Sequence, residues 1–105
     1  MEGERPIRRL VSGVTASLAL IRAAVDDSAD ALLVHHGWFW RGEDPRVTGT
    51  RRARLAEVLG HGLHLFAYHL PLDVHPQLGN NAQLAARMGW RVDGHAGEQD
   101  LIAWH

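Results

Sequence analysis

The sequence predicts an α/β protein with three layers and a mainly parallel sheet built from βαβ units. Two observations support this fold class. Short apolar runs alternate along the chain with segments whose apolar residues recur at helical spacing, and glycines, prolines or polar residues separate them. The short connections are typical of right-handed crossovers between parallel strands. The 105 residues fit one domain, residues 1–105, that is large enough to bury a core.

The first strand and helix are predicted within residues 8–28. Residues 8–14 form a short apolar segment, which indicates a strand. Thr15 or Ser17 can begin a helix, and apolar residues then recur at helical spacing over 18–25 before a polar turn. The next apolar run, 32–34, is continuous, as expected of a strand that is covered on both faces.

The middle of the chain predicts a loop, a helix and a strand. Residues 37–49 are rich in aromatic, charged, glycine and proline residues, which favours a loop. Residues 50–59 have helical periodicity, and Gly60 and Gly62 can end that helix. The apolar run 63–68 then predicts the third strand.

The last third of the chain is less regular. Two prolines after position 70 bracket a predicted turn. Asn80 or Asn81 can cap a third helix, 82–88, which Gly89 ends. Beyond it the pattern is ambiguous, and 91–93 is a candidate for a short strand.

Composition excludes several classes of function. All 11 basic residues are arginines, set against 12 acidic residues, and the net charge of −1 argues against a nucleic-acid-binding surface. The basic cluster of Arg51, Arg52 and Arg54 therefore predicts a solvated helix face. Because the chain has no cysteine, any metal must be bound by imidazole and carboxylate groups.

No segment predicts membrane insertion. Arg8 and Arg9 precede the apolar residues 10–25, an arrangement similar to a signal peptide, but Arg22 interrupts that stretch and no clear cleavage site follows. No run approaches the ~18 apolar residues of a membrane span. We therefore expect a cytoplasmic protein.

Candidate metal ligands follow two of the predicted strands. His35 and His36 come directly after the strand 32–34, and His69 ends the next strand, with Asp73 four residues later. The carboxyl ends of parallel strands share one edge of a sheet, and neighbouring strands lie ~4.8 Å apart. An isolated histidine pair more often bonds loop carbonyl groups, but the second cluster favours a metal site.

The two adjacent histidines leave two geometries open. Successive side chains on a strand point to opposite faces, so both imidazoles can bind one ion only if the chain turns at Gly37. Alternatively, each imidazole binds a different ion of a two-metal site.

Other residues near this edge have alternative interpretations. Trp38 and Trp40 could form a wall of a substrate pocket, and a hydrophobic plug or a subunit interface is an equally good interpretation. His75 could support a ligand through a hydrogen bond, since it follows Asp73 by two residues. We expect the remaining histidines at surface or helix-capping positions: His61, His64, His95 and His105.

Four segments resemble, in order and spacing, the GTP cyclohydrolase 1 type 2 homologues, also called Nif-three-like dinuclear metal proteins. The resemblance covers about residues 8–89 and the first part of the usual family protein. The matching segments are 13–17, 29–40, 68–73 and 79–85. The resemblance implies an α/β fold, a ring-shaped homohexamer with its metal sites facing an internal cavity, and metal ligands at His35, His36, His69 and Asp73.

The resemblance and the residues together leave two functions open. The first is a metal-dependent hydrolase in which a dinuclear centre activates water, with a small-molecule nucleotide as the candidate substrate. The second is a non-catalytic metal-binding or regulatory interaction protein, or an inactive fragment. The family completes its centre with a histidine and a glutamate four residues apart, whereas His95 and Glu98 are three apart and receive no such role. The ligand types suit Zn, Mn, Fe, Ni or Co.

Overall fold

The computed structural model describes residues 1–104, and the chain divides into two compact units with the boundary between Tyr68 and His69. Each unit is described by itself, and the predicted single domain stays a prediction. Among the described residues, no helix is both long enough and apolar enough to cross a membrane.

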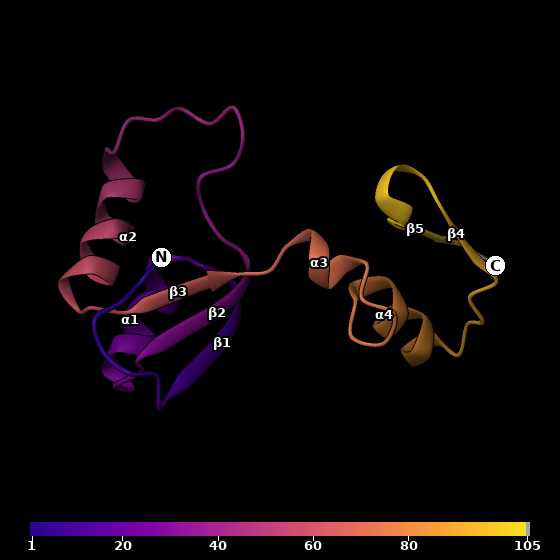
Figure 1. Ribbon diagram of the computed structural model, residues 1–105, viewed down its shortest axis with the longest axis horizontal. Coiled ribbons are helices and arrows are strands. Elements are labelled where there is room, and N and C mark those ends of the chain that lie inside the picture. The colour runs from indigo at the N-terminus through magenta and orange to yellow at the C-terminus, as the bar shows by residue number, and fades with distance from the viewer. Residues whose placement is uncertain (105) are drawn as a thin grey trace. The chain divides into compact units, whose positions relative to one another are not determined.

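The first unit contains a parallel sheet with two helical crossovers (Figure 1). The strand order is β1-β2-β3, and β2 is parallel to both of its neighbours. This topology confirms the predicted α/β fold built from βαβ units. In chain order the elements are β1 (Leu10–Thr15), α1 (Leu18–Asp26), β2 (Ala31–His36), α2 (Gly49–Gly60) and β3 (His64–Ala67).

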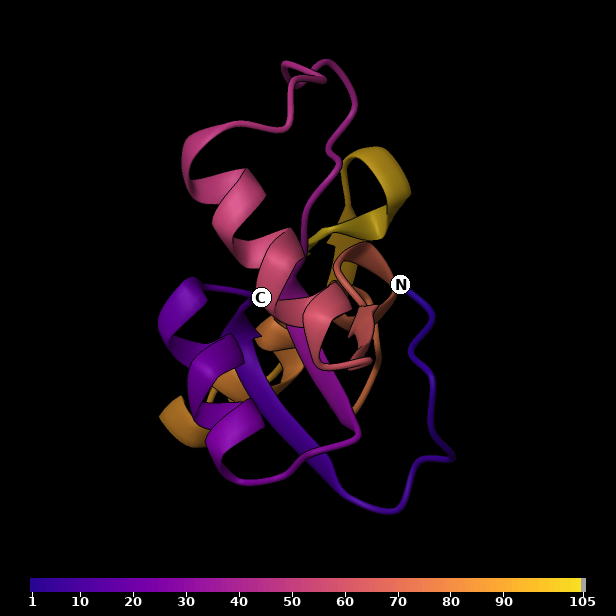
Figure 2. The same ribbon diagram turned by 90° about the vertical axis from the view of Figure 1, so that its left-hand side faces the viewer.

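Both crossover helices lie on one side of the three strands (Figure 2). α1 and α2 contact each other, as expected when sequential right-handed crossovers pass over the same face. A helical layer on the opposite face stays a prediction. The sequence sets the start of α1 through Ser17, whose Oγ accepts a hydrogen bond from the Leu20 backbone N–H at 3.2 Å.

The core lies between the central strand and the two helices. Leu32 of β2 and Ile21 of α1 are fully buried, and Val58 of α2 is 1% exposed. β2 is flanked by a strand on each edge, and its apolar run 31–34 is buried or half-buried throughout. The predicted continuous apolar strand is therefore confirmed, and its carboxyl end emerges from the best-packed part of this unit.

An N-terminal segment, Met1 to Arg5, covers the outer edge of β3. The Met1 ammonium donates to the Leu65 carbonyl at 2.6 Å, and the Leu65 N–H donates to the Met1 carbonyl at 3.0 Å. His64 bonds the same segment, because its Nδ1 accepts from the Gly3 N–H and its Nε2 donates to the Arg5 carbonyl. The segment thereby satisfies an otherwise open sheet edge. The sequence pattern did not indicate this pairing.

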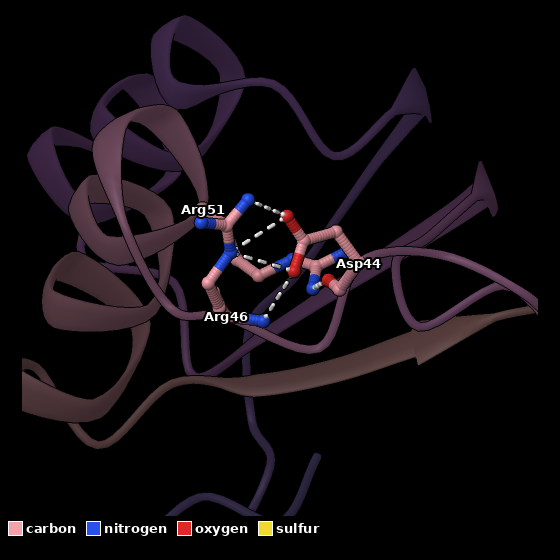
Figure 3. Close-up of polar contacts among 3 residues, drawn as sticks. All are labelled: Asp44, Arg46 and Arg51. Atoms are coloured by element: carbon pink, nitrogen blue, oxygen red, sulfur yellow. Dashed lines mark hydrogen bonds and ion pairs between the residues drawn. The ribbon is translucent and has the colours of Figure 1, made fainter.

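The loop between β2 and α2, residues 37–48, is tied to α2 by Arg51 (Figure 3). The Arg51 Nη2 donates to Glu43 Oε2 at 2.5 Å, and its Nη1 donates to the Asp44 carbonyl. Arg46 pairs with the Asp44 carboxylate at 2.6 Å. The predicted solvated face is therefore wrong for Arg51, whose side chain is only 19% exposed because it binds the loop. Of the same cluster, Arg52 is exposed and Arg54 is half-buried.

The second unit holds two helices and a hairpin. α3 (Leu70–Asp73) occupies the predicted turn, and α4 (Asn80–Met88) matches the predicted third helix. β4 (Gly94–Ala96) and β5 (Ile102–Trp104) pair antiparallel around the 3₁₀ turn Glu98–Asp100. Gly89 ends α4 in the left-handed region with φ 70°, as predicted.

Two predictions for the second unit are wrong. Neither Asn80 nor Asn81 caps α4: the N-cap is Gly79, and both asparagine side chains bond elsewhere, Asn80 to Asp73 and Asn81 to the Leu101 carbonyl. The expected strand 91–93 is absent, because the hairpin register pairs Gly94 with Trp104 and places the strand after it.

Candidate metal centre

His35 and His36 end the central strand with their rings together. Their ring centroids are 4.5 Å apart and the ring planes meet at 62°, an edge-to-face arrangement. The two adjacent imidazoles are thus neighbours in space, although regular strand alternation would separate them. Gly37 follows where β2 and β3 approach closely, because a Cβ placed on Gly37 would lie 2.6 Å from the Ala67 Cβ.

His69 joins this pair to form a cluster of three imidazoles. The preceding residue, Tyr68, donates its N–H to the Val34 carbonyl at 2.9 Å, so the chain is tied to β2 one residue before His69. One nitrogen from each of His35, His36 and His69 lies within 4.8 Å of the others, and all three residues are half-buried. Three imidazoles are a ligand set that suits zinc and other transition metals. This cluster could hold a metal ion.

The His36 ring has a hydroxyl partner that the sequence did not identify. Its Nδ1 lies 3.2 Å from Oγ1 of Thr15, the residue paired with it across β1 and β2. Metal-binding imidazoles usually bond a second group through the nitrogen that does not bind the ion, and that bond sets the orientation of the ring. The only sequence feature that could have indicated this contact is the position of Thr15, directly after the predicted first strand.

Asp73 lies one helical turn after His69, within the second unit. Its Oδ2 is 3.7 Å from His69 Nδ1, and its side chain is 16% exposed. Its Oδ1 accepts a hydrogen bond from Asn80 Nδ2 at 2.6 Å. The carboxylate therefore stands beside the imidazole of His69, as the spacing i, i+4 on α3 allows. Its role as a metal ligand stays a prediction.

His61 and His75 make structural contacts outside the cluster. His61 is the C-cap of α2, and its Nδ1 lies 2.9 Å from the Glu57 carbonyl, which confirms the capping interpretation. His75 Nδ1 accepts from the N–H groups of Gln77 and Leu78, so it stabilises the turn before α4. His95 is exposed in β4, and His105 lies outside the described residues.

The two tryptophans after the histidine pair differ in their surroundings. Trp38 packs against the core cluster, and its Nε1 donates to the buried Ala16 carbonyl at 2.9 Å. This arrangement matches the plug interpretation. Trp40 is 43% exposed, and its backbone N–H donates to Glu43. A role for either ring in a substrate pocket stays a prediction.

The first unit is thus an α/β unit that carries the imidazoles of His35 and His36 at the carboxyl end of its central parallel strand. The sequence model of one family, described as Duf34/NIF3 (NGG1p interacting factor 3), matches residues 1–99. The chain belongs to the Duf34/NIF3 family. This result confirms the family resemblance of the four ordered segments.

Curated relatives share about half of the matched residues. A "GTP cyclohydrolase 1 type 2 homolog" from Vibrio cholerae serotype O1 is 56% identical over 94 residues, which cover 90% of this chain and 37% of the relative. A protein with the same name from Escherichia coli (strain K12) is 49% identical over 104 residues, 99% of this chain and 41% of the relative. The chain therefore spans well under half the length of these relatives.

Solved structures have the same fold. A structural-genomics structure of protein ybgI, of unknown function, matches with a TM-score of 0.88 and 52% identity, over 90% of this chain and 38% of that one. Protein TTHA1606 from Thermus thermophilus matches with a TM-score of 0.80 and 35% identity, over 98% of this chain and 41% of that one.

Proposed function

We propose that the chain binds divalent metal ions and serves a metal-dependent hydrolase reaction. The observation that supports this proposal is the cluster of His35, His36 and His69, whose nitrogens lie within 4.8 Å of one another. We propose Asp73 as the fourth ligand, because a carboxylate adds negative charge and an oxygen donor to the imidazole set. The metal would be Zn, Mn, Fe, Ni or Co.

The donor atoms and the surroundings of these residues fit a divalent metal ion. Each imidazole is half-buried, so the cluster is partly shielded from water. The Thr15 hydroxyl orients the His36 ring, and Asp73 stands beside His69. When bound, divalent ions at such a site lower the pKa of a coordinated water and polarise a substrate oxygen.

The substrate proposal is a small-molecule nucleotide. It rests on the name of the curated relatives, GTP cyclohydrolase 1 type 2 homolog, and on the chemistry of activated water. We expect metal-dependent turnover of GTP or a phosphoester that is abolished in His35→Ala and kept in His95→Ala, since His95 is exposed in β4. Stoichiometric metal binding without any turnover would contradict the hydrolase proposal.

A non-catalytic metal-binding or regulatory protein is the second candidate. The three clustered imidazoles, together with the proposed ligand Asp73, would be a complete set for a single tetrahedral ion, whereas a dinuclear centre normally needs more ligands. Elemental analysis separates the two candidates. Two ions per chain with turnover support the hydrolase, and one ion or fewer without turnover supports the second candidate.

We also propose a cytoplasmic homohexamer. The proposal follows from the assembly that the family resemblance implies. Light scattering coupled to size-exclusion chromatography tests it: a hexamer has about six times the 11.7 kDa mass of the chain. A monomer under the same conditions would contradict it.

A further inference from the structure

We propose that Asn80 is a positioning residue for Asp73 and fixes the orientation of its carboxylate beside His69. The inference rests on the proposed metal-binding function and extends it to the way in which the carboxylate is presented. It concerns three side chains of the second unit, His69, Asp73 and Asn80, whose contacts lie within that unit.

The hydrogen bond distinguishes the two carboxylate oxygens. Asn80 Nδ2 donates to Asp73 Oδ1 at 2.6 Å, whereas Oδ2 is the oxygen that lies 3.7 Å from His69 Nδ1. An ionised carboxylate only accepts hydrogen bonds, so the Asn80 amide must present its NH₂ group to Asp73. Bonds of an N–H group to a charged oxygen are stronger than neutral ones and hold the acceptor more firmly.

Close backbone packing brings Asn80 to Asp73. Asn80 is the first residue of α4, directly after the buried Gly79. A Cβ on Gly79 would lie 2.6 Å from the carbonyl oxygens of both Asp73 and His75, and the Gly79 N–H donates to the His75 carbonyl at 2.9 Å. The start of α4 therefore packs directly on the turn that follows Asp73. The turn itself is stabilised by His75.

The consequence for the proposed ligand is a fixed orientation of its carboxylate. Oδ1 keeps a second lone pair when it accepts from Asn80, so the hydrogen bond restricts rotation of the carboxylate without removing Oδ1 as a donor atom. With Oδ1 held by Asn80, Oδ2 is the oxygen that stays beside His69. Groups that orient a ligand in this way typically change metal affinity ~10–100-fold when removed.

The test is a Co²⁺ titration of wild type, Asn80→Ala and the control Gln83→Ala, followed by absorption spectroscopy. Asn80 is exposed, so its truncation should leave the metal-free fold intact, which circular dichroism and the melting temperature verify. Gln83 lies in the same helix and bonds the Gln77 carbonyl away from Asp73. We expect Asn80→Ala to weaken Co²⁺ binding ~10–100-fold and to change its visible spectrum, and Gln83→Ala to do neither.

A double-mutant cycle with Asp73→Asn identifies the route of the effect. If Asn80 acts through Asp73, adding Asn80→Ala to Asp73→Asn should cause no further loss of Co²⁺ affinity. Equal losses in both backgrounds would overturn the inference, as would an unchanged affinity and spectrum in Asn80→Ala. Failure of the wild-type protein to bind Co²⁺ would instead overturn the proposed function, and the inference with it.

Discussion

The Nδ1 atom of His36 lies 3.2 Å from Oγ1 of Thr15, the residue directly opposite it in the β1–β2 pairing. The pairing of two strands thus places a hydroxyl beside one imidazole of the candidate metal centre. The backbone reinforces the arrangement, because the Ala16 N–H donates to the His36 carbonyl at 2.9 Å.

Replacing Thr15 by valine should weaken metal binding without unfolding the protein. Valine keeps the β-branched shape but loses the hydroxyl that orients the His36 ring. We expect the dissociation constant for Zn²⁺, measured by calorimetric titration, to rise roughly 10-fold. Thr15→Ser keeps the hydroxyl and serves as the matched control. An equal affinity in the valine variant would show that the contact does not orient a ligand.

Replacing Trp38 by phenylalanine should lower the free energy of unfolding. The buried Ala16 carbonyl would lose its donor, Trp38 Nε1, and no water replaces it easily in the core. An unsatisfied buried acceptor costs about 1–2 kcal/mol, which urea denaturation can measure. Unchanged stability together with altered turnover would instead favour the pocket interpretation of Trp38.

Replacing Gly37 by alanine should separate the ends of β2 and β3. The new Cβ would meet the Ala67 Cβ at 2.6 Å, which is too close for two carbon atoms, and the strands must shift. We expect a loss of about 1–3 kcal/mol in unfolding free energy. Metal affinity should fall as well, since the shift moves the ends of the strands that carry the imidazoles.

Gly60→Ala is the control for this substitution. A Cβ at Gly60 meets nothing within 4 Å, and the residue ends α2. Alanine there should be neutral or stabilise by roughly 0.5–1 kcal/mol, with unchanged metal binding. Equal destabilisation by both substitutions would mean that the contact with Ala67 is not the cause.

Asp30 should make the fold sensitive to acid. The backbone N–H groups of Arg8 and Arg9 donate to its Oδ2, each at 2.9 Å, and hold the pKa of its carboxyl below the usual 3.8. Because the pKa is lower in the folded state, the stabilisation is present above the unfolded pKa and is lost as pH falls through the folded pKa.

The comparison of wild type with Asp30→Asn measures this contribution. Urea denaturation at several pH values should show the largest stability difference near neutral pH, and the difference should shrink on acidification below about pH 4. A difference that stays constant down to acid pH would show that the charge of Asp30 does not stabilise the fold.

The strands and helices of the first unit could be predicted because burial determines their pattern. The continuous apolar run in β2 and the helical spacing of α1 both follow from contact with one core. The N-terminal segment beside β3 could not be predicted, because its pairing uses backbone groups and His64, which leave no apolar periodicity. The hairpin β4–β5 was missed for a similar reason, since its strands are only three residues long.

The candidate site was partly predictable from strand ends. Parallel strands bring their carboxyl ends together, so grouping His36 with His69 required only the order of the strands. The supporting residues could not be predicted: the contact of Thr15 depends on the strand register, and the sequence position of Asn80 is typical of a helix cap although its side chain bonds Asp73. Such contacts depend on tertiary packing rather than on sequence spacing.

The most direct test of the proposed metal centre is a crystal structure of the metal-loaded protein, with the ions located by anomalous scattering. We predict ions within about 2.0–2.2 Å of nitrogens from His35, His36 and His69 and of an oxygen of Asp73. Ions bound elsewhere on the chain, or no bound ion at saturating metal with the three imidazoles apart, would contradict it.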